Sequence, residues 1–148
     1  MPVPELDANG VLPDGVFDCT LAEVAQRFGG FQGSDRRPRL FARLEDLVAA
    51  MKRSGLFEAV LLDGSFVTAK GSPNDIDLIA VLPPDHNFER DLAMSEYALV
   101  SRPLLKRRFG VDAVLARRDS PLYHTYVEFF SRVREAAQLR KGLLRLRL

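Results

Sequence analysis

The sequence contains almost no cysteine and no long apolar run. Cys19 is the only cysteine among 148 residues, which excludes an internal disulfide and a cysteine-based metal site. The longest apolar runs, such as 59–62, are far too short to span a bilayer. The first residues lack the basic start and the apolar core of a signal peptide. We therefore expect a cytoplasmic protein that does not contact a membrane.

Several catalytic signatures are also absent. The pattern Gly-x4-Gly-Lys-Ser/Thr does not occur, which argues against a P-loop NTPase. The two histidines, His86 and His124, are isolated along the chain, and Ser65 does not lie in a nucleophile elbow. A histidine metal centre and a serine hydrolase are therefore not indicated.

The composition is that of an ordinary globular domain. Hydrophobic residues make up 47% and charged residues 28% of the chain, and this length fits one compact domain, 1–148. The net charge is only +1, but residues 101–118 carry six bases and one acid, as do residues 132–148. This asymmetry indicates either a positive face that attracts a polyanion, such as RNA, or merely solvated helix and strand surfaces.

Residue periodicity and turn residues predict an α/β fold, α+β in some schemes, with a short mixed sheet and flanking helices. Residues 1–15 are rich in Pro, Gly and Asp and are predicted to form an irregular arm, and residues 31–38 a loop. Helices are expected over 20–28, 40–53, 85–108 (divided at Pro103) and 123–130, and strands over 57–62, 76–82, 111–116 and 144–148.

The most informative segment is LLDGSFVTAKGSPNDIDL, residues 61–78. Gly64 lacks a Cβ, so its backbone can approach a bulky anion, and Ser65 and the following amides can donate to phosphate oxygens. Asp75 and Asp77 are two residues apart on a strand, so their carboxylates leave the same face about 7 Å apart at the backbone. Magnesium prefers carboxylates together with phosphate oxygens. The segment therefore predicts a metal–triphosphate site, although either half alone is common in turns and strand ends.

Gly-Ser, then nine residues, then Asp-hydrophobic-Asp-hydrophobic resembles the signature of the DNA polymerase beta-like nucleotidyltransferase superfamily. The resemblance implies that Gly64 and Ser65 hold a nucleoside triphosphate such as ATP, and that Asp75 and Asp77 bind Mg²⁺ or Mn²⁺. It also implies a third carboxylate on a neighbouring strand, which here would be Asp112. The sequence motifs LDGSFVT and PNDID resemble those of uncharacterised bacterial proteins of that superfamily, and this similarity extends over most of the chain.

One departure concerns the residues after the Gly-Ser pair. Small nucleotidyltransferases of toxin–antitoxin systems often carry arginines there, whereas this chain has Phe66 and Val67. Lys70 is the first nearby base, and it is either a phosphate ligand or a surface lysine.

Two functions are therefore expected. The first is transfer of a nucleotidyl group to an unknown hydroxyl of a protein, an RNA end or a small molecule. The alternative is a catalytically weak binding module, the antitoxin-like partner of another protein. The presence of Asp112 favours the enzyme, and the missing arginines favour the binding module.

Overall fold

The computed structural model describes residues 3–70, 73–133 and 136–148. A five-stranded sheet with strand order β1-β7-β2-β3-β4 lies at its centre. These strands are β1 (Val16–Cys19), β2 (Ala59–Asp63), β3 (Ile76–Leu82), β4 (Val111–Arg117) and β7 (Leu143–Arg147). Strand β2 runs antiparallel to both β3 and β7, whereas β3–β4 and β1–β7 are parallel pairs. The predicted α+β class with a mixed sheet is confirmed.

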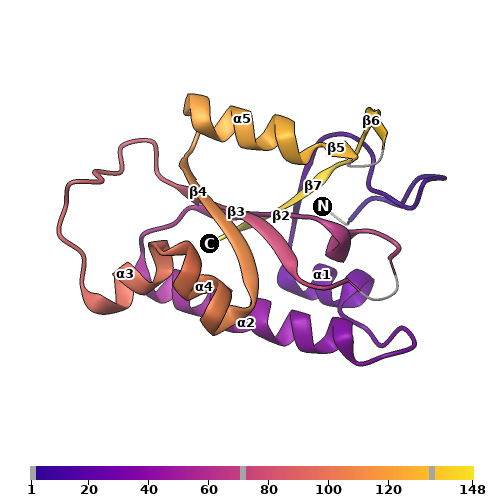
Figure 1. Ribbon diagram of the computed structural model, residues 1–148, viewed down its shortest axis with the longest axis horizontal. Helices are drawn as coiled ribbons and strands as arrows, with labels where there is room; N and C mark the ends of the chain where they lie inside the picture. Colours follow the sequence, from indigo (N-terminus) through magenta and orange to yellow (C-terminus); the bar gives the residue numbers. More distant parts are fainter. Residues whose placement is uncertain (1–2, 71–72, 134–135) are drawn as a thin grey trace.

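Helices cover both faces of the sheet (Figure 1). One face is covered by α1 (Leu21–Phe28), α2 (Arg36–Ser54), α3 (Met94–Val100) and α4 (Arg102–Phe109), and the other by α5 (Pro121–Phe130). Alternation along the strands supplies a separate apolar core to each face. None of the helices in the described ranges is both long and apolar enough to cross a membrane.

Local sequence signals set the ends of the first two helices. Thr20 caps α1, and its hydroxyl accepts from the Glu23 amide at 3.2 Å while the Glu23 carboxylate accepts from the Thr20 amide at 3.1 Å. Helix α2 ends at Gly55, whose φ of +68° favours glycine. Both helix ends are those predicted from the sequence.

The helix expected over 85–108 is the main error of the sequence-based prediction. Residues 83–93 contain turns but no helix, and α3 starts only at Met94. The Asn87 side chain accepts from the Glu89 amide at 2.9 Å, which competes with the helical hydrogen-bond pattern. Residues 94–109 are helical and are divided near Pro103, as expected. Pro103 lies in the first turn of α4, two residues after the capping residue Ser101.

Other differences concern short elements and one helix boundary. Strand β1 and the hairpin β5 (Arg132–Val133) with β6 (Ala136–Arg140) were not predicted, and α2 begins at Arg36, inside the predicted loop 31–38. The last strand is internal, between β1 and β2. Its Arg145 donates to Asp18 of β1, and this bond is the main reason that the pKa of Asp18 is lowered to about 2.

Candidate functional site

Three aspartates form a row across the central strands. Asp63 ends β2 and lies opposite Asp77 of β3, which in turn lies opposite Asp112 of β4. Directly opposed residues point to the same face of a sheet. The face is the one covered by α5, because the residues two positions inward from each aspartate pack in the α5-side core: Leu61, Ile79 and Val114. Asp112 therefore lies on the same face as Asp77.

The chain turns at Gly64, directly against the side chain of Asp77. Its φ of +78° and ψ of −169° lie in a region that only glycine adopts readily. A Cβ added to Gly64 would lie 2.3 Å from Oδ2 of Asp77, so the Asp77 carboxylate occupies the space over the glycine. Ser65 follows and opens the single 3₁₀ turn Ser65–Val67. The Gly-Ser turn and the second aspartate of the motif are therefore in direct contact.

Burial and the neighbouring acids raise the pKa of Asp77, the central member of the row. Burial is the largest cause, the charges of Asp75, Asp63 and Asp112 add to it, and together they raise the pKa of Asp77 to about 6 despite the opposing effect of Lys141. Crowding of this kind is reduced when a cation binds between the carboxylates.

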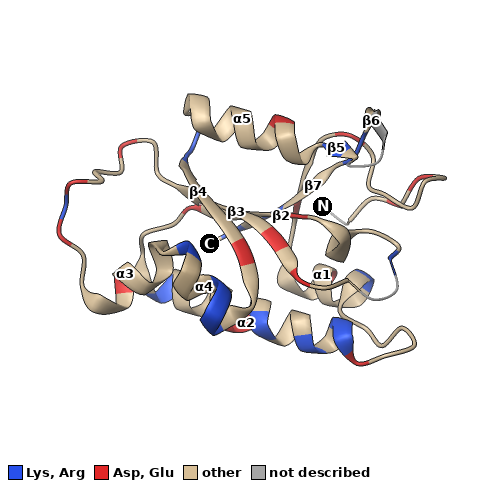
Figure 2. Ribbon diagram, viewed as in Figure 1, with Lys and Arg blue, Asp and Glu red and all other residues tan. Residues whose placement is uncertain are grey.

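Two bases of α4 contact Asp75 and Asp112. Nζ of Lys106 lies 2.7 Å from Oδ2 of Asp75, and Nη2 of Arg102 lies 2.9 Å from Oδ1 of Asp112. Figure 2 shows acidic segments of β3 and β4 side by side, next to basic segments of α4. Since the pairs are solvent-exposed, each contributes little to stability and can be exchanged for another ion.

The side chains expected to bind a metal do not converge in this conformation. Within residues 3–70, 73–133 and 136–148, no three side chains of His, Cys, Asp or Glu are grouped closely enough to hold a metal ion. Asp75 and Asp112 are instead turned toward Lys106 and Arg102. A shared cation would require both carboxylates to leave these bases.

Sequence reasoning missed the buried ion pair of Asp63 and Lys141. Asp63 is only 2% exposed, and Nζ of Lys141 lies 3.4 Å from its Oδ1. Burial raises the pKa of Asp63, and the charge of Lys141 opposes the rise. The available signal was the charged residue at the end of the apolar run 59–62, since a carboxylate in that position needs a cation.

Arg37 of α2 was also missed, and it holds the loop that contains Ser65. Its side chain is 1% exposed and donates to the carbonyl oxygens of Phe66 at 2.6 Å and Thr68 at 2.9 Å. It also donates to the carbonyl of Lys70, whose own side chain is exposed. Residues 71–72, which join this loop to the aspartates, lie outside the described residues. Arg37 thus fixes the backbone of the loop that directly follows the Gly-Ser turn.

Substituting Gly64 by alanine is expected to disturb both the turn and Asp77. The positive φ and the 2.3 Å approach together should lower the free energy of unfolding by about 2 kcal/mol and displace the carboxylate. Thermal melting and magnesium–ATP titration by calorimetry measure the two effects, and we expect binding to weaken at least tenfold.

Gly33→Ala is the matched control for this experiment. Gly33 also has a positive φ, of +75°, but no atom lies within 4 Å of the added Cβ. We expect a loss of about 1 kcal/mol from backbone strain and unchanged nucleotide binding. If Gly64→Ala bound ATP as tightly as the Gly33 variant, the turn would not be part of a nucleotide site.

Comparison with known proteins places the chain in one family. Neither a search of curated proteins nor a search of solved structures finds a match. Residues 4–147 match a family described as "Family of unknown function (DUF6932)", which is nearly the whole chain. The chain therefore belongs to the DUF6932 family.

Proposed function

We propose that this protein is a cytoplasmic nucleotidyltransferase, which binds a magnesium-bound nucleoside triphosphate and transfers the nucleotidyl group to a hydroxyl acceptor. The observation that supports this function best is the contact between the Gly64 turn and Asp77, because it joins a phosphate-binding turn to a carboxylate row. Two parts of the chain that are separated in sequence thereby form one candidate site.

The carboxylates present have the chemistry that a hard divalent cation prefers, although Asp75 and Asp112 would have to leave Lys106 and Arg102 to share one. Burial and the charges of the neighbouring carboxylates raise the pKa of Asp77, and a bound cation relieves the repulsion among these carboxylates. Asp75, Asp77 and Asp112 are the residues that would hold Mg²⁺ or Mn²⁺. When bound, the metal would neutralise the phosphate charge and polarise the α-phosphate.

The remaining steps belong to side chains and amides of this chain. Gly64 and Ser65 would bind the phosphate oxygens, with Lys70 at the exposed end of the same loop. The acceptor oxygen forms a bond to the α-phosphorus as the bond to the bridging oxygen of the β-phosphate breaks, and pyrophosphate leaves. Asp112 would orient the attacking hydroxyl and take its proton.

A second candidate function is a binding module with weak or no catalysis, which displays the fold to a protein partner. The observation that favours it is the pairing of Arg102 with Asp112 and of Lys106 with Asp75, since both acids already have a counter-ion.

Asp112→Ala is expected to separate the two functions. A carboxylate that acts on the acceptor contributes in the transition state, so magnesium–ATP affinity should change by only a few-fold while transfer falls at least about 100-fold. Calorimetry measures the affinity. Incubation with each α-labelled triphosphate, magnesium and cell extract measures the transfer and identifies the acceptor as protein, RNA or small molecule.

Asp35→Ala is the matched control, because Asp35 is an exposed aspartate paired with Arg39 at 3.3 Å, away from the row of acids. It should leave both binding and labelling unchanged. Nucleotide binding by the wild type without any label transfer would favour the binding module, and a failure to bind any triphosphate would refute both forms of the proposal.

A further inference from the structure

Lys141 approaches the Gly-Ser turn from the side opposite Asp77. Strand β7 pairs antiparallel with β2, with Leu144 opposite Leu62. Continuing this pairing beyond the end of the strands brings Lys141 toward the turn at Gly64 and Ser65. The 3.4 Å separation between its Nζ and Oδ1 of Asp63, the residue before Gly64, agrees with this position. The ammonium group of Lys141 therefore lies beside the residue that precedes the turn, and its charge also acts on Asp77.

The backbone of Lys141 is fixed by contacts on both sides. Its amide donates to the Ser131 carbonyl at 2.8 Å, and the Gly142 amide donates to the Leu12 carbonyl at 3.0 Å. A Cβ on Gly142 would lie 2.1 Å from the Pro13 carbonyl oxygen, so only glycine permits the N-terminal arm to pass this closely.

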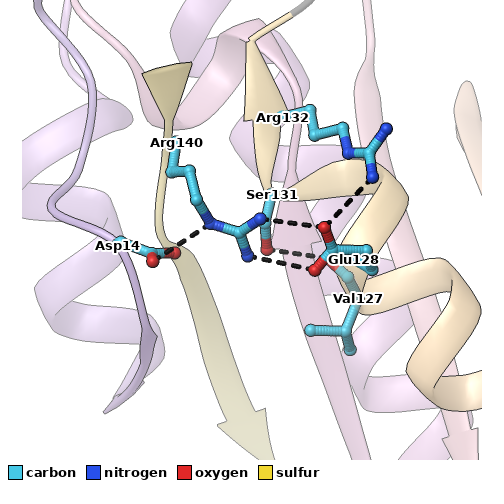
Figure 3. Close-up of polar contacts among 6 residues, drawn as sticks. All are labelled: Asp14, Val127, Glu128, Ser131, Arg132 and Arg140. Atoms are coloured by element: carbon cyan, nitrogen blue, oxygen red, sulfur yellow. Dashed lines mark hydrogen bonds and ion pairs between the residues drawn. The ribbon is translucent and has the colours of Figure 1, made fainter. Parts of the chain in front are cut away.

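The preceding residue, Arg140, ties the same segment to two other parts of the chain. Its guanidinium binds Asp14 of the arm at 3.1 Å and binds Glu128 of α5 through two bonds, at 2.9 and 3.2 Å (Figure 3). Bidentate bonds to a carboxylate restrict the orientation of the arginine. Lys141 is thus held at its place by the arm, by α5 and by the start of β7.

The ion pair with Asp63 leaves part of the bonding capacity of both groups unused. Within the described residues, the buried Oδ1 of Asp63 has no hydrogen-bond partner, although the ammonium group is 3.4 Å away. A lysine carries three donors, and its side chain here is 17% exposed. A buried ion pair that served stability alone would gain little over an apolar pair of the same size.

The two residues directly after the Gly-Ser pair supply no cation to the turn. Phe66 and Val67 are fully buried in the helix-side core, and Lys70 lies at the exposed end of the loop. A triphosphate bound on Gly64 and Ser65 carries several negative charges beside the row of aspartates. A cation placed next to the turn would offset this charge, and Lys141, which is partly exposed and whose Nζ lies 3.4 Å from Oδ1 of Asp63, is the base beside the residue that precedes the turn.

We propose that Lys141 is the phosphate-binding cation of this site, and that Asp63 positions it beside the Gly-Ser turn. This inference rests on the proposed function and deepens it, because it assigns the contact with the β- and γ-phosphates to a segment near the C-terminal end of the sequence. It also explains how the chain can bind a triphosphate without arginines after Ser65.

The test compares Lys141→Met with the double variant Asp63→Asn/Lys141→Met. The single variant leaves Asp63 buried without a cation and should lose stability, whereas the double variant replaces the ion pair by neutral side chains of similar size and should melt close to the wild type. We expect the double variant to bind magnesium–ATP and inorganic tripolyphosphate at least tenfold more weakly than the wild type. Lys52→Met, an exposed lysine of α2, is the control and should bind as the wild type does.

Each outcome is decisive. If the double variant binds both probes as tightly as the wild type, Lys141 only neutralises Asp63 and the inference is wrong while the proposed function stands. If the wild type binds neither probe, the proposed function fails as well.

Acetylation of the wild-type protein gives a readout that does not depend on the variants folding. Magnesium–tripolyphosphate should slow acetylation of Lys141 at least fivefold, measured by mass spectrometry, and leave Lys52 unchanged. An equal rate at Lys141 with and without the probe would overturn the assignment.

Discussion

Replacing Asp77 by asparagine is expected to raise the melting temperature of the ligand-free protein and to abolish nucleotidyl transfer. Asp77 lies between Asp63 and Asp112 in the register and against Gly64, and burial with the neighbouring acids raises its pKa to about 6. Such repulsion is tolerated where it serves a site. Two pKa units correspond to about 3 kcal/mol, and partial exposure reduces the expected gain to about 1 kcal/mol, or about 3 °C.

The increase in melting temperature caused by Asp77→Asn should become larger as the pH rises. The pKa of Asp77 is about 6 in the folded protein and 3.8 as the ordinary value, so the folded state binds more protons between these limits. The penalty of the ionised carboxylate is thus present above pH 6 and disappears as the pH falls below about 4. The difference in melting temperature between Asp77→Asn and the wild type should be largest at pH 8 and small at pH 4.

Asp18→Asn provides a contrast on the same sheet. Arg145 lowers the pKa of Asp18 to about 2, so ionisation of this aspartate stabilises the fold at neutral pH. Its substitution should lower the melting temperature at pH 8, opposite to the effect at Asp77. A clear loss of stability in Asp77→Asn would mean that Asp77 is structurally paired, and would count against a metal site.

Replacing Arg37 by methionine is expected to cause the largest loss of stability, about 3–5 kcal/mol. The buried guanidinium packs against the rings of Phe28 and Phe66, with its Cζ 5.9 and 5.4 Å from their centroids. It also donates to carbonyls of the loop after Gly64, which methionine would leave without a donor. Chemical denaturation measures the loss, and nucleotide binding should weaken because the loop is released.

Arg39→Met is the control on the same helix. Arg39 pairs with Asp35 at 3.3 Å, with both side chains largely exposed, so its loss should cost less than about 0.5 kcal/mol. If the two variants were equally stable, the buried guanidinium would not hold the loop, and the positioning role given to Arg37 would be wrong.

Elements with strong local signals were predictable. The capping box at Thr20, the glycine stop at Gly55 and the apolar strand Ile76–Leu82 each depend on neighbouring residues, and all three occur where the sequence indicates. The helix expected over 85–93 failed because local side-chain hydrogen bonds compete with helix formation there. Strand β1 was missed because its four residues form a strand only through pairing with β7, more than 120 residues away.

The sequence by itself determined the chemical content of the candidate site. The spacing of Gly64, Ser65, Asp75 and Asp77 indicates a turn and a carboxylate pair, because a strand places alternate residues on one face. Only the tertiary structure decided which groups join them. Strand register aligns Asp63, Asp77 and Asp112. Helix packing buries Arg37 against the loop that follows Gly64. The pairing of β7 with β2 places Lys141, just before β7, beside Asp63. These contacts join residues far apart in the chain, and sequence periodicity carries no information about which strands become neighbours.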